Sequence, residues 1–189
     1  MYGAVDDPYC YADTSVLRNR LGLRDQAALD AFEADAVQQR GEEPLPGGSL
    51  SVAHYRAVHR HLFRDVYRWA GRFRTVRISK PGSMFCYPER IPAEMDRVFS
   101  ELQRAGFLRG LGRGDFVTGA AGFIADLNAI HPFREGNGRA QMVFLALVAS
   151  RAGHPLRLER IDGPRFLAAM VAGFHGDVSV LEAQLASIT

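Results

Sequence analysis

The segment that follows Gly138 is apolar on nearly every side when it is read with the period of an α-helix. A helix without a polar face cannot border water, so other parts of the chain must surround it. We therefore expect this segment to be the central buried helix of a helical domain. With 189 residues, of which 47% are hydrophobic, the chain is long enough to build such a core as one domain.

Other stretches repeat apolar residues at three- and four-residue spacings, which indicates further helices. They are two short helices in 15–40 joined near Gly22, a long helix in 52–69 before Gly71, and helices in 91–108, 116–130, 162–174 and 177–187, the last with Asp177 as N-cap. Loops are expected at 41–49 and 109–115, which are rich in glycine. The expected fold class is all-α, with one domain over 1–189, a motif-bearing core at about 11–152 and C-terminal helices in 153–189.

Residues 72–88 have a different pattern. The stretch FRTVRIS alternates apolar and polar residues and is rich in β-formers, and KPGS supplies a turn before MFCYP. We expect a small β-hairpin here, inside an otherwise helical protein.

Composition excludes several classes of function. The 23 basic and 21 acidic residues leave a net charge of +2, so no overall field favours nucleic acid or an anionic membrane as a partner. The longest apolar run, 142–149, is far shorter than the ~20 residues of a membrane span. Cys10 and Cys86 are too few for a disulfide framework, and the first residues lack the pattern of a signal peptide. We expect a cytoplasmic protein, and export by another route stays open.

The chemistry is expected in the run HPFREGNGR, residues 131–139, which connects the two best-predicted helices. Gly136 and Gly138 allow backbone conformations that expose successive N–H groups to an anion. The N-terminus of the following helix favours phosphate as well, and Arg139 adds a permanent positive charge. This run therefore predicts a phosphate-binding site.

Two side chains of the same run suit the chemistry of a polyphosphate. Magnesium takes hard oxygen ligands and commonly only one or two protein carboxylates, a role that fits Glu135. An imidazole with a near-ordinary pKa of ~6.5 is largely neutral at pH 7, so His131 can accept a proton from an attacking hydroxyl. Base, metal ligand and phosphate cradle thus fall within nine consecutive residues.

The run resembles the signature of the Fic family, HxFx(D/E)GNGRxxR. The surrounding LNAIHPFREGNGR, the upstream HRHLFRDVYRWAGRFRTV and the early TSVLRNRLG also look like segments of the Fic fold, so the resemblance covers most of 11–152. It implies a helical Fic fold with a hairpin flap, ATP as co-substrate and Mg²⁺. The implied roles are His131 as general base, Phe133 as the anchor of the loop, Glu135 as metal ligand, and Gly136, Asn137, Gly138 and Arg139 as ligands of the ATP phosphates.

In this family a β-hairpin flap docks the target segment beside the α-phosphate, and residues 74–88 look like that flap. Lys80 and Phe85 are the candidates for contacts with the nucleotide or target there. Pairing of the flap with the target backbone would be strand addition, a mode that tolerates different target sequences.

One position departs from the signature. The second arginine of the motif is replaced by Met142, which removes a charged partner both for the terminal phosphate and for an inhibitory glutamate. Either ATP binding is weakened or another arginine substitutes, for which Arg134 and Arg151 are nearby in sequence. The inhibitory motif [S/T]xxxE[G/N] is also absent, since its nearest match, 14–19, carries Arg18 at the glutamate position. Two possibilities stay open: a separate small antitoxin inhibits the protein, or no glutamate inhibits it.

The resemblance thus implies a protein adenylyltransferase that moves AMP from Mg-ATP to a Ser, Thr or Tyr hydroxyl. Analogy with compact bacterial Fic toxins adds type II topoisomerase subunits as a target class. One alternative is a transferase of the same fold that uses another nucleotide, moves phosphocholine, or acts as a kinase, although Gly138 argues against the kinase branch. The other is a catalytically silent binding module.

His54, His59 and His61 share one expected helix, where packing or surface roles outweigh a metal site.

Overall fold

The computed structural model describes residues 7–80 and 82–189. In these residues the chain forms seven α-helices and one two-stranded antiparallel sheet, which confirms the all-α class with a small hairpin. The helices are α1 (Gln26–Glu42), α2 (Val52–Phe63), α3 (Ile91–Arg104), α4 (Arg113–Ile130), α5 (Asn137–Ala152), α6 (Gly163–Phe174) and α7 (Ser179–Ile188). Three short 3₁₀ segments lie at Pro88–Arg90, Gly106–Leu108 and Leu158–Arg160.

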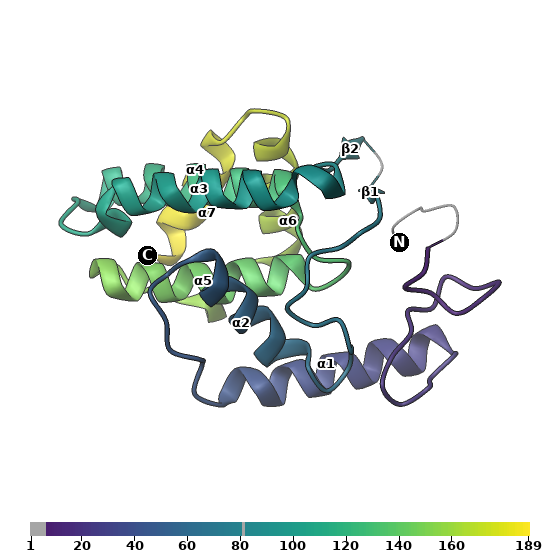
Figure 1. Ribbon diagram of the computed structural model, residues 1–189. Helices are drawn as coiled ribbons and strands as arrows, with labels where there is room; N and C mark the ends of the chain where they lie inside the picture. Colours follow the sequence, from purple (N-terminus) through teal and green to yellow (C-terminus); the bar gives the residue numbers. More distant parts are fainter. Residues whose placement is uncertain (1–6, 81) are drawn as a thin grey trace.

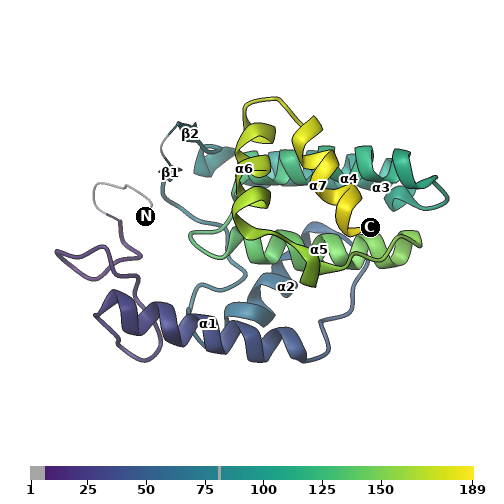
Figure 2. The ribbon, with the colours of Figure 1, turned by 180° about the vertical axis from the view of Figure 1, so that it is seen from behind.

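Helix α5 lies between the α3–α4 pair on one side and the α1–α2 pair on the other (Figure 1). Helices α6 and α7 pack on α4 and come to the front when the molecule is seen from behind (Figure 2). The expected central helix is therefore in place. Its burial is uneven, because Phe144, Leu145 and Val148 are fully buried while Met142 and Val143 are half-buried.

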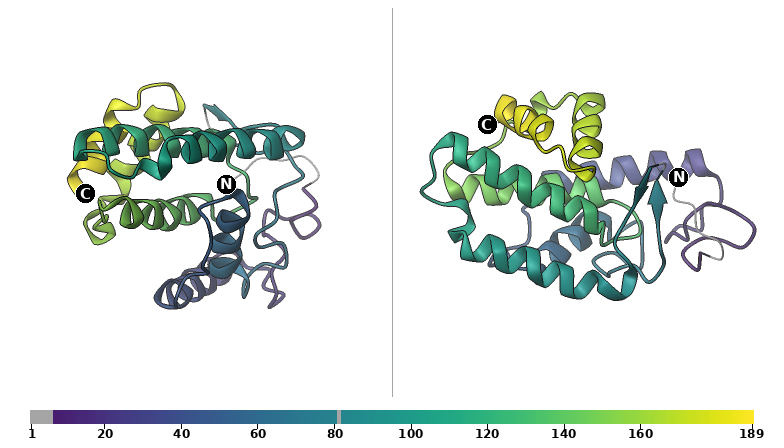
Figure 3. Two further views of the ribbon diagram at one scale, coloured as in Figure 1. Left: turned by 60° about the vertical axis from the view of Figure 1, so that its left-hand side comes forward. Right: turned by 90° about the horizontal axis from the view of Figure 1, so that it is seen from above.

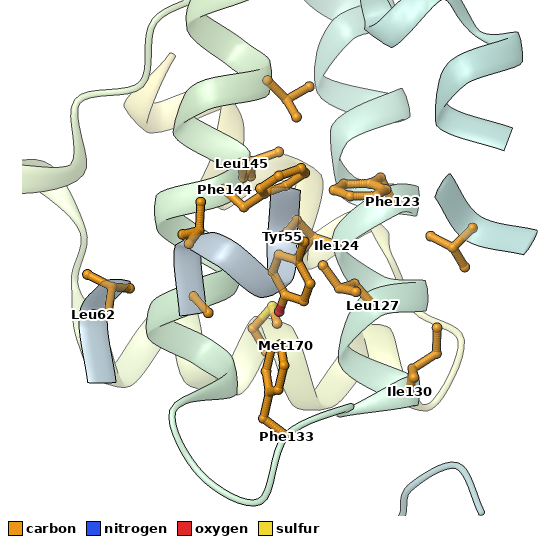
Figure 4. Close-up of a cluster of buried hydrophobic side chains, with 14 of the residues drawn as sticks. Tyr55, Leu62, Phe123, Ile124, Leu127, Ile130, Phe133, Phe144, Leu145 and Met170 are labelled. Carbon is orange, nitrogen blue, oxygen red and sulfur yellow. The ribbon is translucent and has the colours of Figure 1, made fainter. Parts of the chain in front are cut away.

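Aromatic rings fill the space between α2, α4 and α5 (Figure 4). Tyr55 of α2 packs against Phe144 of α5 and Phe133 of the connecting loop, with ring centroids 5.2 and 5.3 Å apart. Edge-to-face and tilted contacts of this kind add to the free energy gained by burial. The connection between α4 and α5 is thereby fixed to the core.

Residues 15–25 do not form the short helix that their spacing predicts. The amide of Asn19 donates to the carbonyls of Leu17 and Leu23, and its oxygen accepts from the N–H of Leu23. These local side-chain bonds satisfy the backbone in a turn, so they compete with a helix. Helix α1 begins only after Asp25, whose carboxylate accepts from the N–H of Ala28.

Helix α2 ends at Phe63, six residues before the expected end at Trp69. The ring of Tyr67 stacks on Trp69 at 4.4 Å, and the N–H of Gly71 donates to the Nδ1 atom of His59. Both contacts need the chain to turn back along α2. The apolar residues in 64–69 are therefore spaced as in a helix because they belong to a buried turn, and α2 does not continue through them.

The hairpin is much shorter than the alternation in 72–88 predicts. Its two strands are Ser79–Lys80 and Ser83–Met84, with Ser79 opposite Met84 and Lys80 opposite Ser83. It lies at one end of the bundle (Figure 3). Residues 73–78 are not a strand, because the side chain of Arg74 is buried and donates to backbone carbonyls of other segments.

Three smaller boundaries also differ from the expectation. Helix α1 continues through Gly41 to Glu42, and α4 begins at Arg113 inside the glycine-rich connection. The N-cap of α7 is Val178, although the carboxylate of Asp177 still accepts from the N–H of Ser179.

Candidate active site

His131 is the C-cap of α4 and takes a left-handed backbone conformation, with φ 49° and ψ 62°. Such a conformation is uncommon for a residue with a side chain and needs support from its surroundings. The Nδ1 atom of the ring lies 3.1 Å from the carbonyl oxygen of Asn128. Because a carbonyl can only accept, the proton sits on Nδ1, and Nε2 carries the lone pair that can take up another proton.

The ring of His131 is shielded from water. Burial lowers its pKa to about 3, the charges of Lys80 and Arg74 act in the same direction, and the bond to Asn128 offsets part of the effect. The ordinary pKa expected from the sequence is therefore wrong for the protein without a ligand. The imidazole is neutral at pH 7, the state in which it can act as a base.

Arg74 holds the end of α4 and the two ends of the hairpin segment together. Its guanidinium donates to the carbonyls of His131 and Ile130 at the end of α4, and to those of Val76 and Cys86 on either side of the hairpin. The C-terminal carbonyls of a helix have no partners within the helix and favour a positive charge. Sequence pattern alone does not reveal Arg74, because an arginine among alternating residues looks like the exposed face of a strand.

Asn137 fixes the loop from within. Its oxygen accepts from the N–H of Phe133 at 2.9 Å, and its amide donates to the carbonyl of Phe133 at 2.8 Å. The side chain is 1% exposed, so it is committed to the loop. The side chain is therefore not available for the predicted contact with a phosphate. Only the backbone N–H of Asn137 could make that contact. Phe133 is fully buried, as the predicted anchor role requires.

The two glycines of the loop differ in their geometry. Gly136 is the N-cap of α5 with φ 78°, and a Cβ there would lie 2.3 Å from the ring of Phe63. Gly138 lies in the first turn of α5, and open space surrounds the position of its missing Cβ. Only Gly136 therefore needs its conformational freedom, and Gly138 leaves room above the helix N-terminus. Gly136 has no side chain to cap this N-terminus, although its own N–H donates to the carboxylate of Glu135 at 2.9 Å. The N–H groups of the first turn that follows remain suited to an anion.

His59 supports the same loop from α2. Its Nε2 atom lies 3.0 Å from the carbonyl of Glu135, while its Nδ1 accepts from the N–H of Gly71. The ring is fully buried and stacks on Phe133 with centroids 3.7 Å apart. Burial lowers the pKa of His59 to about 3. The packing role expected for this residue includes positioning of the loop, which sequence spacing alone could not indicate.

Arg139 meets a carboxylate that no motif predicted. Its guanidinium contacts the carboxylate of Glu33 on α1, whose other oxygen accepts from the hydroxyl of Tyr67. Arg139 also lies 3.8 Å from Glu135 and over the ring of Phe63. Burial raises the pKa of Glu135, and the charge of Glu33 adds to that effect. Two carboxylates therefore surround one arginine.

Neither nearby arginine takes the place of the one missing at Met142. Arg134 is buried and forms an ion pair with Asp7, with 2.6 Å between the nitrogen and the oxygen. Arg151 lies at the other end of α5 and donates to the carbonyl of Gly48. Arg139 is thus the arginine that the structure places at the start of α5.

The hairpin brings Phe85 onto His131. The two rings stack with centroids 3.9 Å apart, and Phe85 is 5% exposed. Lys80 is exposed on β1, and its charge reaches His131. The structure therefore brings the hairpin residues to the predicted base, and their contacts with a nucleotide stay a prediction.

Comparison with known proteins decides the family. The model of the Fic/DOC family matches residues 49–149. The chain belongs to the Fic/DOC family. A probable protein adenylyltransferase of Sinorhizobium fredii is 49% identical over 185 residues, which cover 97% of this chain and 96% of that protein. The probable protein adenylyltransferase Fic of Escherichia coli is 34% identical over 96% of this chain and 91% of its own length.

Solved Fic structures agree with this fold. The BepC protein of Bartonella tribocorum, determined with bound AMPPNP, has a TM-score of 0.85 and 25% identity, with 95% of each chain covered. The predicted family and the predicted enzyme class, a nucleotidyltransferase, are confirmed by these relatives. Within the described part of this Fic protein, no helix combines the length and apolar character needed to cross a membrane.

Replacement of Arg74 tests its structural role. In Arg74→Met, four carbonyls lose their donor, two of them in buried hydrogen bonds, so we expect the free energy of unfolding to fall by about 3 kcal/mol. Urea denaturation followed by circular dichroism measures this. Arg72→Met, on an exposed side chain two residues away, is the control and should change stability by less than ~0.5 kcal/mol. Equal stability of Arg74→Met and the wild type would contradict the role.

The buried histidines predict acid sensitivity. The pKa of His59 is lower in the folded state than its ordinary value, so the unfolded chain binds the proton more readily as the pH falls from about 6.5 toward 3. We expect this group to reduce stability by up to about 1.4 kcal/mol per pH unit in that window. His59→Gln should show a shallower decline when unfolding is measured across the window. The same decline of stability with falling pH in both proteins would exclude His59 as a source of the acid sensitivity.

Proposed function

We propose that this protein transfers AMP from Mg-ATP to a Ser, Thr or Tyr hydroxyl of another protein, with His131 as the general base. The observation that carries the proposal is a neutral imidazole with its lone pair on Nε2, connected by residues 132–136 to an N-terminus of α5 whose N-cap residue has no capping side chain. Base and phosphate site are joined by a loop that Arg74, His59 and Asn137 hold in place. Bound AMPPNP in a solved relative supports a nucleotide co-substrate.

In this mechanism the target oxygen attacks the α-phosphorus of ATP, and the bond from that phosphorus to the bridging oxygen breaks. The hydroxyl proton moves to Nε2 of His131, and pyrophosphate leaves. The bond from Nδ1–H to Asn128 keeps the accepting nitrogen in its orientation. Nucleotide phosphates would counter the charges of Lys80 and Arg74, and so raise the pKa of His131 toward the working pH.

The residues at the site fit Mg²⁺. Glu135 and Glu33 line one cavity of about 330 Å³, together with Asp30. Carboxylate oxygens are the hard ligands that Mg²⁺ takes, and one or two of them suffice beside phosphate oxygens. Glu135 would hold the ion, which would neutralise part of the phosphate charge when bound. Binding of the ion would also keep Glu135 ionised, against the effect of burial.

The partners follow from the same arrangement. The hairpin of 74–88 stacks Phe85 on His131, so a target segment paired with it would present its hydroxyl near the base. A small antitoxin with a glutamate-bearing helix is a further proposed partner, since Arg139 already pairs with a carboxylate. Type II topoisomerase subunits are a target class by analogy alone.

We place the activity in the bacterial cytoplasm, where Cys10 and Cys86 would remain thiols.

Labelled ATP tests the reaction. Purified protein with Mg²⁺ and bacterial lysate should transfer label to protein from α-labelled ATP and not from γ-labelled ATP. His131→Ala should lower the transfer rate at least about a hundredfold, because it removes the base. The control is His61→Ala, whose ring bonds to the carbonyl of Arg40. Transfer from γ-labelled ATP alone would make the protein a kinase, and nucleotide binding without transfer would support the silent module.

Replacement of Glu33 tests its effect on nucleotide binding. Glu33→Gln keeps hydrogen-bonding atoms toward Arg139 and Tyr67 and removes a negative charge near the phosphates. We expect Mg-ATP to bind about threefold more tightly, since the pair with the partly exposed Arg139 is a weak one. Calorimetry in a His131→Ala background measures binding without turnover. Asp35→Asn, at an exposed position of the same helix outside the cavity, is the control, and weaker binding in Glu33→Gln would show that Glu33 positions Arg139 for the phosphates.

A further inference from the structure

Arginine occupies every fourth position from residue 56 to residue 72. The fold brings all five side chains, and one more from the N-terminal segment, to one depression of about 430 Å³. They are Arg20, Arg56, Arg60, Arg64, Arg68 and Arg72. All six are exposed, and no acidic residue of the described part of the chain lines the depression, which we call the arginine groove.

The groove is built by the turn that ends α2. Arg56 and Arg60 lie on α2, while Arg68 and Arg72 follow in the turns that bring the chain back along it. The N–H of Arg20 donates to the carbonyl of Val66 at 2.9 Å, which holds the N-terminal segment against the same turn. Helical periodicity alone would not gather these charges, because α2 ends at Phe63.

The concentration of like charge is only partly balanced within the protein, where the charges of Arg64 and Arg20 act on Asp65 and help to lower its pKa. Like charges four residues apart on a helix repel each other. Arg64 has an ion pair with Glu43 at 3.7 Å, whereas Arg60, Arg68 and Arg72 form none with the described residues. The dipole of α2 favours basic residues in its last turn, but Arg68 and Arg72 lie beyond its end. The whole chain carries a net charge of only +2, so this density is local.

The floor of the groove is made partly of small residues whose backbone donors are already used. Small residues, Ala53, Ala57, Ala70 and Gly71, form part of it and let another backbone approach. The N–H of Ala70 donates to the carbonyl of Tyr67, and that of Gly71 donates to His59. Phosphate sites commonly use such backbone donors, as the N-terminus of α5 can. Here the donors are the guanidinium groups of separate side chains, each of which can bind a carboxylate or a phosphate through two hydrogen bonds.

We propose that the arginine groove docks an acidic segment of a partner protein, whose Asp or Glu side chains pair with Arg60, Arg68 and Arg72. Charge complementarity at such a surface favours the correct partner and speeds association. His131 and Arg139 are not among the lining residues. The groove therefore adds a second protein-binding surface, separate from the hairpin, and does not depend on the proposed AMP transfer.

Peptide binding tests this surface. A fluorescein-labelled oligoglutamate peptide should bind the full chain saturably at low ionic strength, measured by fluorescence anisotropy, and salt should weaken it. In the double variant Arg68→Glu and Arg72→Glu, we expect the Kd to rise at least about tenfold. Circular dichroism verifies folding, and transfer from α-labelled ATP should be unchanged.

The matched control is the double variant Arg160→Glu and Arg165→Glu, which changes the net charge equally on exposed residues of the C-terminal region. It should retain peptide binding. Equal weakening in both double variants would reduce the effect to net charge and overturn the proposal. Displacement of the peptide by lower concentrations of duplex DNA or inorganic tripolyphosphate would overturn the assignment to a protein segment. So would failure of the peptide to bind.

Discussion

The buried guanidinium of Arg74 is the interaction on which the geometry of the site depends. It donates to four carbonyls that belong to the end of α4 and to the two sides of the hairpin. Without this donor, the left-handed turn at His131 would leave buried carbonyls without partners, and the hairpin would lose its attachment beside the proposed base. One charged side chain, placed among backbone oxygens, thus connects the proposed base to the segment proposed to hold the target.

The sequence predicted the elements with strong periodicity and the loop with its unusual composition. Helices α3 to α7 lie within a few residues of their expected positions, because amphipathic spacing is a local property. The errors fall where tertiary contacts decide. Tyr67 and Trp69 keep helical spacing in a turn, Asn19 replaces helical bonds with its own amide, and Arg74 is buried where alternation predicted a strand face.

In the candidate site, too, the local sequence pattern was predictive and the tertiary contacts were not. The motif identified His131, Glu135 and Arg139, but the residues that orient them come from distant parts of the chain and have no spacing in common. His59 reaches the carbonyl of Glu135 across 76 positions, and Glu33 reaches Arg139 across 106. Such partners are defined by packing, so only the three-dimensional arrangement could reveal them.

Charge balance links these observations. The described residues around Arg139 provide the carboxylates of Glu33 and Glu135, so the region is close to neutral or negative before any phosphate arrives. A nucleotide with several negative charges binds there only if a cation accompanies it or if Arg139 leaves Glu33. Because Met142 supplies no second positive charge, the balance between Glu33 and phosphate at Arg139 should set the affinity for nucleotide. On this proposal, a residue on α1 would tune the site from outside the motif that is expected to carry the chemistry.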